Sequence, residues 1–227
     1  MSTRDITQLS ALKQWIDDKG QVDYNGIKKD PWFAEQIQKI ETANLKDLDY
    51  NDEFAFWLNA YNLTTIKAVL LELERTPQWK GILSLYSFRF VNFFYLRKYK
   101  IANKMMSLTH LENKILRKRF QDPRLHFAIN CGSNSCPFLP DRLFIGANLD
   151  ELLDSLTTFF INDPNNVSYD EKSNNLTLNT IFKWYRKDFK AVGGAVEFIK
   201  KYQKDLAEKL NQPKIKYFRY DWGLNSQ

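Results

Sequence analysis

The chain of 227 residues is poor in glycine, proline, cysteine and histidine, and each shortage excludes a class of protein. Glycine occurs 8 times and proline 7 times, too rarely for a collagen-like, linker or low-complexity chain. The 2 cysteines cannot form the disulfide framework of a small secreted domain. A four-ligand zinc site would need both cysteines and both histidines, so we expect no metal and no other cofactor.

Long apolar runs are also missing. No stretch of about 18 apolar residues is present, so we expect no membrane-spanning helix. The segment from Met1 to Gly20 has neither the apolar core nor the small-residue cleavage site of a secretory signal. As it stands, the chain is therefore expected in the cytoplasm.

Aromatic residues, by contrast, are abundant at 15% of the chain, and such rings are placed in a core, a groove or an interface. With 44% hydrophobic and 26% charged residues, the composition is that of a globular protein. The length fits one large domain. We predict an N-terminal helical extension over residues 1–49 that packs on a main domain over residues 50–227.

Helical signals cover most of the chain. Leu9 and Leu12 begin an apolar face over residues 8–18, and Asp30-Pro31 is typical of the start of a helix that ends near Thr42. Residues 51–74 predict a long helix. Further helices are expected over 109–120, where Thr109 and Glu112 have capping-box spacing, from 148 to about 160, near 179–188 and near 193–210.

Short strands are predicted between these helices. Residues 84–106 have an aromatic, roughly alternating pattern that predicts irregular strand and a hairpin with a turn at 102–104. Residues 125–130 predict a buried strand. A hairpin over 167–178 and a terminal strand near 215–220 complete the set. The predicted fold class is therefore α+β, with helices packed on a small antiparallel sheet.

Positive charge is concentrated in residues 75–119, which carry 11 basic side chains and a single acid, Glu112. Residues 1–74 carry 8 basic and 13 acidic side chains, so some of the cations can pair with that segment. The others form either a solvated face or a patch that attracts an anionic small molecule or peptide. No nucleic-acid-binding motif is present, so nucleic acid is not the expected partner. The candidate anion-binding residues are Arg97, Lys98, Lys100, Arg117 and Arg119.

Both cysteines and one histidine fall within the segment LHFAINCGSNSC. In a strand, His126 and Asn130 would share one face, and the following loop would bring Cys136 back over it. Pro137 favours the first turn of a helix, which would place Cys136 at an N-cap where the helix dipole stabilises a thiolate. A thiol of low pKa beside an imidazole is what nucleophilic catalysis requires.

Other interpretations of this segment remain open. A cysteine is often only a small buried apolar side chain, and Cys131 fits that description. The C-x4-C spacing of Cys131 and Cys136 also suits a redox pair. His126 is equally explained as a hydrogen-bonded histidine inside a strand.

A second polar feature is the helix segment FWLNAYN, in which Asn59 and Asn62 share a face. Two amides on a buried aromatic helix need hydrogen-bonding partners. They either anchor loops or donate to a substrate oxyanion. The segment YDWGLN at 220–225 combines polar and aromatic residues, which predicts that it docks on the domain.

Five segments follow one another in a characteristic order: FWLNAYN (56–62), LENKILR (111–117), HFAINCGSNSCP (126–137), FKWY (182–185) and YDWGLN (220–225). Together they resemble domain-of-unknown-function family 547. The resemblance implies a cysteine-proteinase-type fold with a Cys–His site, in which the family cysteine is Cys136 and the family histidine is His126. The family usually has a histidine after the glutamate of its LE segment, where this chain has Asn113. If that histidine were the catalytic base, this protein would be an impaired or inactive enzyme.

Two hypotheses about function follow. The first is a thiol-dependent acyl-transfer enzyme, a hydrolase or transpeptidase acting on a peptide-like or anionic small substrate, with Cys136 as nucleophile and His126 as base. Backbone amides of residues 132–136 would hold the oxyanion. The candidates for orienting the imidazole are Glu112, Asn130 and Asp221, and those for contacting substrate or oxyanion are Asn59, Asn62, Ser135 and Cys131. The second hypothesis is a non-catalytic binding or scaffold module that uses the basic surface of residues 75–119 for an anionic partner.

Overall fold

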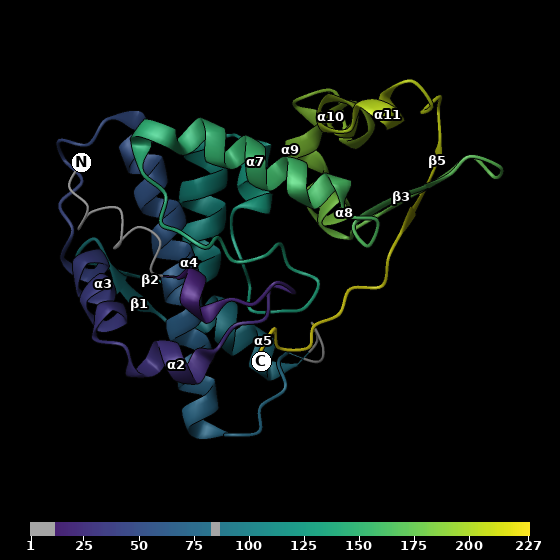
Figure 1. Ribbon diagram of the computed structural model, residues 1–227. Coiled ribbons are helices and arrows are strands. Elements are labelled where there is room, and N and C mark those ends of the chain that lie inside the picture. Colours follow the sequence, from purple (N-terminus) through teal and green to yellow (C-terminus); the bar gives the residue numbers. More distant parts are fainter. Residues whose placement is uncertain (1–11, 83–86) are drawn as a thin grey trace.

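The structure, a computed structural model, describes residues 12–82 and 87–227 and has an α+β fold, as expected. Its centre is α4, a helix of 26 residues from Tyr50 to Arg75 (Figure 1). Asp49 caps this helix by accepting a hydrogen bond from the backbone N–H of Asp52. Most side chains of α4 are buried, because the other elements surround it.

Shorter helices follow one another around α4, and the predicted helix from Pro31 to Thr42 is confirmed. No helix within residues 12–82 and 87–227 is long and apolar enough to cross a lipid bilayer. The α-helices besides α4 are α2 (Tyr24–Lys29), α3 (Pro31–Thr42), α5 (Phe88–Val91), α6 (Leu108–His110), α7 (Leu149–Asn162), α8 (Ile181–Trp184), α9 (Arg186–Lys190), α10 (Ala195–Tyr202) and α11 (Lys204–Ala207). The 3-10 turns are η1 (Lys13–Trp15), η4 (Pro123–Phe127) and η5 (Gly146–Asn148), and the π-helical segments are η2 (Asn92–Leu96) and η3 (Leu111–Phe120).

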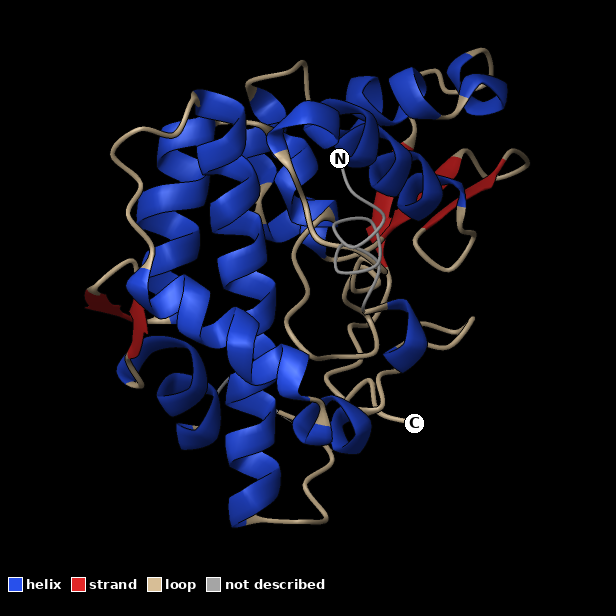
Figure 2. Ribbon diagram, turned by 60° about the vertical axis from the view of Figure 1, so that its left-hand side comes forward, coloured by secondary structure: helices blue, strands red, loops and turns tan. Residues whose placement is uncertain are grey.

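Two small sheets lie on opposite sides of this helical body (Figure 2). One is the antiparallel hairpin of β1 (Tyr99–Ile101) and β2 (Lys104–Met106). The other has the order β3 (Val167–Asp170), β4 (Asn175–Leu178) and β5 (Lys214–Tyr217). The prediction of a purely antiparallel sheet is wrong for β5, which runs parallel to β4 because the chain returns through α8–α11 before adding it.

Two hydrophobic clusters make up the interior. The larger one extends from Leu12 to Leu153 and contains α4, and the smaller one combines Phe127 with residues of α7–α10, β3 and β4. Residues 12–49 contribute to the larger cluster and so pack directly on α4. The boundary at residue 50 between an extension and a main domain stays a prediction.

The predicted strand over residues 125–130 is wrong, because the 3-10 turn η4 extends to Phe127 and residues 128–130 form no strand. Asp122 caps the turn by accepting a hydrogen bond from Arg124 N, and Pro123 takes its first position. This is the same Asp-Pro signal that starts α3. The argument that His126 and Asn130 share a strand face therefore fails.

Two other local predictions are corrected. Residues 88–96 are helical rather than extended, because Ser87 caps α5 by accepting a hydrogen bond from Phe90 N, and only residues 99–106 form the predicted hairpin. The helix that includes Glu112 starts at Ser107, whose hydroxyl accepts from His110 N, so Thr109 is not its cap. Within the predicted helix over 8–18, residues 8–11, including Leu9, lie outside the described residues, and only Lys13–Trp15 are helical.

The two amides of the FWLNAYN helix anchor loops. Asn62 Nδ2 donates to Ala128 O at 2.9 Å, and its Oδ1 accepts from Asn130 N at 2.9 Å. Asn59 makes the same pair of bonds with Phe144, at 2.8 and 2.9 Å. Asn62 thus ties α4 to the chain that enters the cysteine loop, whereas Asn59 holds a different loop. Each amide uses its oxygen and one N–H on loop backbone, which supports the loop-anchoring interpretation over the oxyanion one.

Replacement of Asn62 by leucine is expected to lower the free energy of unfolding by about 1–3 kcal/mol, because two buried backbone groups lose their partner. The matched control is Asn51→Leu in the exposed first turn of the same helix, which should change stability by less than about 0.5 kcal/mol. Urea unfolding of both variants measures the difference. Equal stability of the two variants would contradict the anchoring role of Asn62.

Candidate functional site

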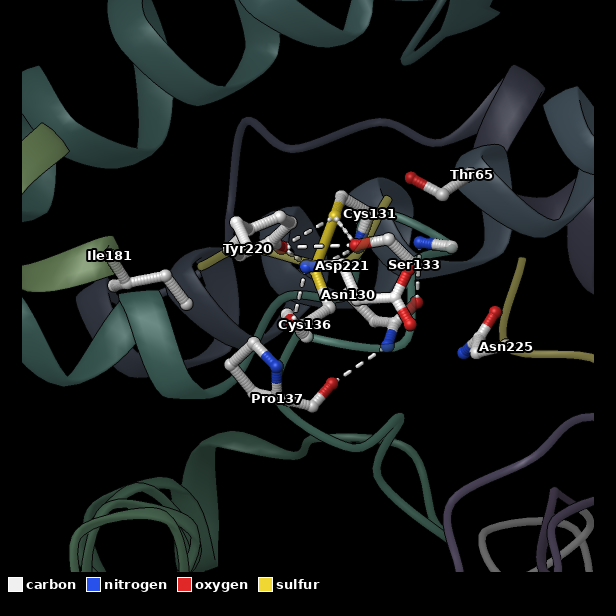
Figure 3. Close-up of a disulfide and its surroundings, with 12 residues drawn as sticks. Thr65, Asn130, Cys131, Ser133, Cys136, Pro137, Ile181, Tyr220, Asp221 and Asn225 are labelled. Atoms are coloured by element: carbon white, nitrogen blue, oxygen red, sulfur yellow. Dashed lines mark hydrogen bonds between the residues drawn. A yellow bond between two sulfur atoms is a disulfide. The ribbon is translucent and has the colours of Figure 1, made fainter. Parts of the chain in front are cut away.

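The two cysteines are bonded to each other. Cys131 and Cys136 form a disulfide that closes a short loop (Figure 3). The loop turns at Gly132, whose φ is +80°, and Cys136 N donates to Ser133 O at 3.1 Å. No helix follows Pro137 before η5, so the prediction of Cys136 at a helix N-cap is wrong. This bond agrees with the redox-pair interpretation of the C-x4-C spacing, and a free thiol at Cys136 requires its reduction.

The YDWGLN segment clamps this loop, as its composition predicted. After β5 the chain runs back across the molecule towards α5 (Figure 1). Asn134 N donates to Gly223 O at 2.8 Å, and Asp221 N donates to the Ser135 hydroxyl at 2.8 Å. Gly81 permits this docking, because a Cβ there would lie 2.5 Å from Leu224 N.

Tyr220, delivered by the same segment, lies beside both sulfurs (Figure 3). Its hydroxyl accepts a hydrogen bond from the Ser133 hydroxyl at 3.0 Å and donates to Cys136 Sγ at 3.4 Å. Burial raises the pKa of Tyr220, so the phenol stays protonated and remains a donor. Cys136 Sγ also accepts the backbone N–H of Cys131 at 2.9 Å. Two donors therefore point at the Cys136 sulfur.

His126 is held by a carboxylate and not by the loop. Its Nε2 lies 2.8 Å from Oδ2 of Asp188, and its side chain is fully buried. Asp188 also accepts two hydrogen bonds from the guanidinium of Arg117, at 2.7 and 2.9 Å. Burial raises the pKa of Asp188, but the hydrogen bonds from His126 and Arg117 outweigh it and hold that pKa well below its usual value.

The proton on the His126 ring is located by this contact. An ionised carboxylate only accepts hydrogen bonds, so Nε2 carries the hydrogen and Nδ1 has a free lone pair. Nδ1 is buried and has no hydrogen-bond partner among the described residues. Burial lowers the pKa of His126 below 6.5, although Asp188 and Glu112 oppose the shift. His126 is therefore a neutral imidazole with its basic nitrogen unoccupied.

Glu112 orients a tyrosine that supports His126. Its carboxylate accepts from the hydroxyl of Tyr185 at 2.6 Å and from that of Tyr61 at 3.1 Å. The ring of Tyr185 stacks on His126 with 3.8 Å between centroids, and the Arg117 guanidinium lies 4.9 Å from the Tyr185 ring centre. Glu112 thus acts on the imidazole through Tyr185, instead of serving as part of a capping box.

These groups meet in a pocket of about 420 Å³ between the two hydrophobic clusters. His126, Glu112 and both cysteines line it, and the rest of the wall is mainly aromatic. The aromatic wall is made by Tyr61, Phe90, Phe94, Tyr95, Trp184, Tyr185, Tyr220 and Trp222. Both π-helical segments, η2 and η3, contribute to the lining, and such wide turns are frequent at functional sites.

Asn130 and Asp221, two of the residues predicted to orient the imidazole, make their contacts elsewhere. Asn130 donates to Pro137 O and accepts from Gly132 N, both at 2.7 Å, and so shapes the loop. Asp221 accepts from Asn134 Nδ2 at 3.0 Å. Four of the five loop amides predicted as an oxyanion hole already donate: Gly132 N to Asn130, Asn134 N to Gly223, Ser135 N to Asp221 and Cys136 N to Ser133.

The candidate anion-binding residues are largely neutralised. Arg97 pairs with Glu72 and Arg119 with Glu53, which are both in the acidic N-terminal segment. Arg117 also donates to Asn113, the residue that replaces the family histidine and that lines the pocket. Lys98 and Lys100 are exposed and do not line this pocket. Within the described residues, no group of three acidic, cysteine or histidine side chains is arranged to hold a metal ion.

Sequence reasoning missed three members of the site, Asp188, Tyr185 and Tyr220. Tyr185 and Tyr220 stand in the FKWY and YDWGLN segments, so the motifs contained a signal that was not assigned to individual residues. Asp188 lies 62 positions after His126 within the ordinary-looking helix α9. Nothing in its local sequence marks it.

The tautomer of His126 can be measured by NMR of the imidazole nitrogens in a His110→Gln variant, which leaves one histidine in the chain. At pH 7 we expect hydrogen on Nε2, none on Nδ1 and a titration midpoint below 6.5. An added Asp188→Asn substitution should move the hydrogen to Nδ1, because an amide can donate to Nε2. Hydrogen on Nδ1 in the protein with Asp188 intact, or a midpoint above 6.5, would contradict the arrangement.

The sequence comparisons agree with part of the motif pattern. The family described as "Protein of unknown function, DUF547" matches residues 45–161, just over half of the chain. The match includes FWLNAYN, LENKILR and HFAINCGSNSCP, whereas FKWY and YDWGLN lie beyond it. No curated protein and no solved structure matches the chain. On its motifs and on the extent of the family match, the chain belongs to the DUF547 family.

Proposed function

We propose that this protein is a thiol-dependent acyl-transfer enzyme, a hydrolase or transpeptidase, that acts in its reduced form. The observation that carries the proposal is the buried, neutral His126, which has an unpaired Nδ1 and lines the same pocket as Cys136. A nucleophile, a base and a carboxylate that orients the base are the three parts of a catalytic triad. Here the carboxylate is Asp188, which acts as a positioning residue.

The chemical step uses the lone pair on Nδ1. His126 Nδ1 takes the proton of the Cys136 thiol, and Sγ forms a bond to the substrate carbonyl carbon. When the bond to the leaving amine or alcohol breaks, the same proton passes from Nδ1 to the leaving group. Water or another amine then attacks the thioester while Nδ1 accepts its proton, and Cys136 leaves as the thiol.

Tyr220 is the donor best suited to the oxyanion. Its hydroxyl already donates to Cys136 Sγ, and its raised pKa keeps it protonated over the whole neutral range. A donor placed beside the nucleophile stabilises the negative charge that develops on the carbonyl oxygen. This assignment replaces Asn59 and Asn62, which bind loop backbone, and the loop amides, most of which already donate within the protein.

The disulfide is the inactive form of this site. Cys136 Sγ bonded to Cys131 Sγ cannot attack a carbonyl. Two electrons and two protons from an external thiol, such as a dithiol or a glutathione-type thiol, convert the disulfide into two thiols while the donor is oxidised to its own disulfide. The hydroxyl of Tyr220 lies 3.4 Å from both sulfurs, but only Cys136 also receives a backbone N–H, that of Cys131, which favours its thiolate.

Paired serine variants test the proposal, because each of them removes the disulfide. Cys131→Ser leaves Cys136 as a free thiol, and we expect it to form an acyl-enzyme with p-nitrophenyl acetate without any reductant. Cys136→Ser should form none, with or without reductant. Intact-mass spectrometry after mixing measures the adduct, and peptide mapping places it.

The wild-type protein provides the redox control. It should be acylated only after treatment with dithiothreitol, and the rate should fall as the pH drops below the lowered pKa of His126, since the protonated ring is no base. Asp188→Asn should slow acylation by about 10³–10⁴-fold if the tautomer changes. Acylation of Cys131 in preference to Cys136, or activity of the Cys136→Ser variant equal to that of Cys131→Ser, would refute the proposal.

A further inference from the structure

A second pocket, of about 490 Å³, adjoins the first. Cys136 and Tyr220 line both pockets, whereas His126 lines only the aromatic one. The nucleophilic sulfur of the proposed function therefore lies at a junction between two cavities. A substrate bond placed at Cys136 would have one portion in each of them.

The two pockets differ in chemistry. The second is lined largely by amides and hydroxyls, among them Asn165, Asn166 and Thr180. It also contains two exposed cations, Lys19 and Arg219, and neither has a carboxylate partner among the described residues. The pocket's one carboxylate, Asp163, already accepts hydrogen bonds from Asn165 and Asn166. The second pocket is thus polar and carries an excess of positive charge, whereas the first is aromatic.

We propose that the second pocket is a subsite for a carboxylate-bearing portion of the substrate, with Lys19 and Arg219 as the residues that recognise the carboxylate. This inference rests on the proposed acyl-transfer function and specifies its substrate class. The substrate is an amide or ester with an anionic, hydrogen-bonding portion on one side of the carbonyl and an apolar portion on the other. The rings of Trp184 and Trp222 would contact the apolar portion.

The position of His126 determines which portion of the substrate is the leaving group and which is the acyl portion. The general acid must protonate the leaving group, so the leaving group lies on the side of the imidazole, in the aromatic pocket. The acyl portion that stays on Cys136 then occupies the polar pocket and carries the carboxylate. In the acylation step, the carbonyl carbon forms a bond to Cys136 Sγ, and its bond to an apolar amine or alcohol breaks. The thiol proton leaves with that amine or alcohol. Water then releases a product with two carboxylates.

Binding is measured first, in a protein that cannot turn over. Calorimetry on the reduced Cys136→Ser variant compares two anilides. One is the monoanilide of glutaric acid (glutaranilide), which has a free carboxylate, and the other is valeranilide, its neutral analogue. We expect glutaranilide to bind about tenfold more tightly, as one charge-assisted hydrogen bond would provide. Its advantage should shrink between 50 and 500 mM salt, over which the screening length falls several-fold.

Charge variants then locate the carboxylate. Lys19→Gln with Arg219→Gln, introduced into the same protein, should abolish the preference for glutaranilide. Lys46→Gln with Lys172→Gln removes the same net charge from exposed positions that line neither pocket, and should preserve the preference. Equal affinity for the two anilides would overturn the subsite. A preference that survives the loss of Lys19 and Arg219 would overturn it as well.

Turnover separates this inference from the function on which it rests. Reduced wild-type protein should hydrolyse the glutaryl amide of 7-amino-4-methylcoumarin about tenfold faster, in kcat/KM, than the valeryl amide. Charge-dependent binding with no release of the coumarin would refute the acyl-transfer function and leave the anion subsite standing. Release of the coumarin at equal rates from both amides would refute the subsite alone. Faster cleavage of phenylacetyl-aspartate than of the glutaryl amide would overturn the assigned orientation.

Discussion

The contact of Asp188 with both Arg117 and His126 is the interaction on which the site depends. It joins η3, which belongs to the larger hydrophobic cluster, to α9, which belongs to the smaller one. The pocket lies between these clusters, so the same carboxylate that holds its two walls together also determines the tautomer of the base. Arg117 keeps Asp188 ionised, and an ionised Asp188 keeps the hydrogen on Nε2. A change at any of the three residues would therefore alter both the shape and the chemistry of the pocket.

Around that contact, polar groups are satisfied with few exceptions. Asn62 and Asn130 each use their side-chain oxygen and nitrogen on defined partners, and the carboxylate of Glu112 accepts from two tyrosines. His126 Nδ1 is different, because it is buried and lacks a partner within the described residues, and His126 lines the pocket. Leaving a buried acceptor unpaired costs on the order of 1–3 kcal/mol, and a fold tolerates that cost more readily where the group has a task. The missing hydrogen-bond partner of Nδ1 is therefore the feature of the site that most favours a functional role for His126.

The sequence predicted the parts of the fold that depend on local signals. α3 begins at Asp30-Pro31 as expected, and α4 and the hairpin of β3 and β4 follow their patterns. The same Asp-Pro signal at Asp122-Pro123 was outweighed by the apolar run that follows it, so a 3-10 turn was mistaken for a strand. The parallel pairing of β5 depends on a return of the chain through four helices, which no local pattern encodes.

Prediction of the site was limited in the same way. His126, Cys136 and Glu112 were singled out because they stand in short motifs, and they line one pocket. Their partners were not predicted, because they are distant in the chain: Asp188 for His126 and Tyr185 for Glu112. The disulfide agrees with the redox-pair interpretation, which the C-x4-C spacing left open beside the others. Spacing alone does not show whether a loop returns, and here the turn at Gly132 brings the two sulfurs together.

The docking of residues 220–225 on the cysteine loop also bears on how the protein is made. Tyr61 and Tyr220, at widely separated positions in the chain, both line the aromatic pocket. A ribosome that has synthesised the motif around Cys136 has still to add α9 and the segment that clamps the loop. Until those residues emerge, the nascent chain lacks Asp188 beside His126 and Tyr220 beside the two sulfurs. The pocket would therefore be completed only after residues 220–225 have been synthesised, later than the cysteine motif whose loop they bind.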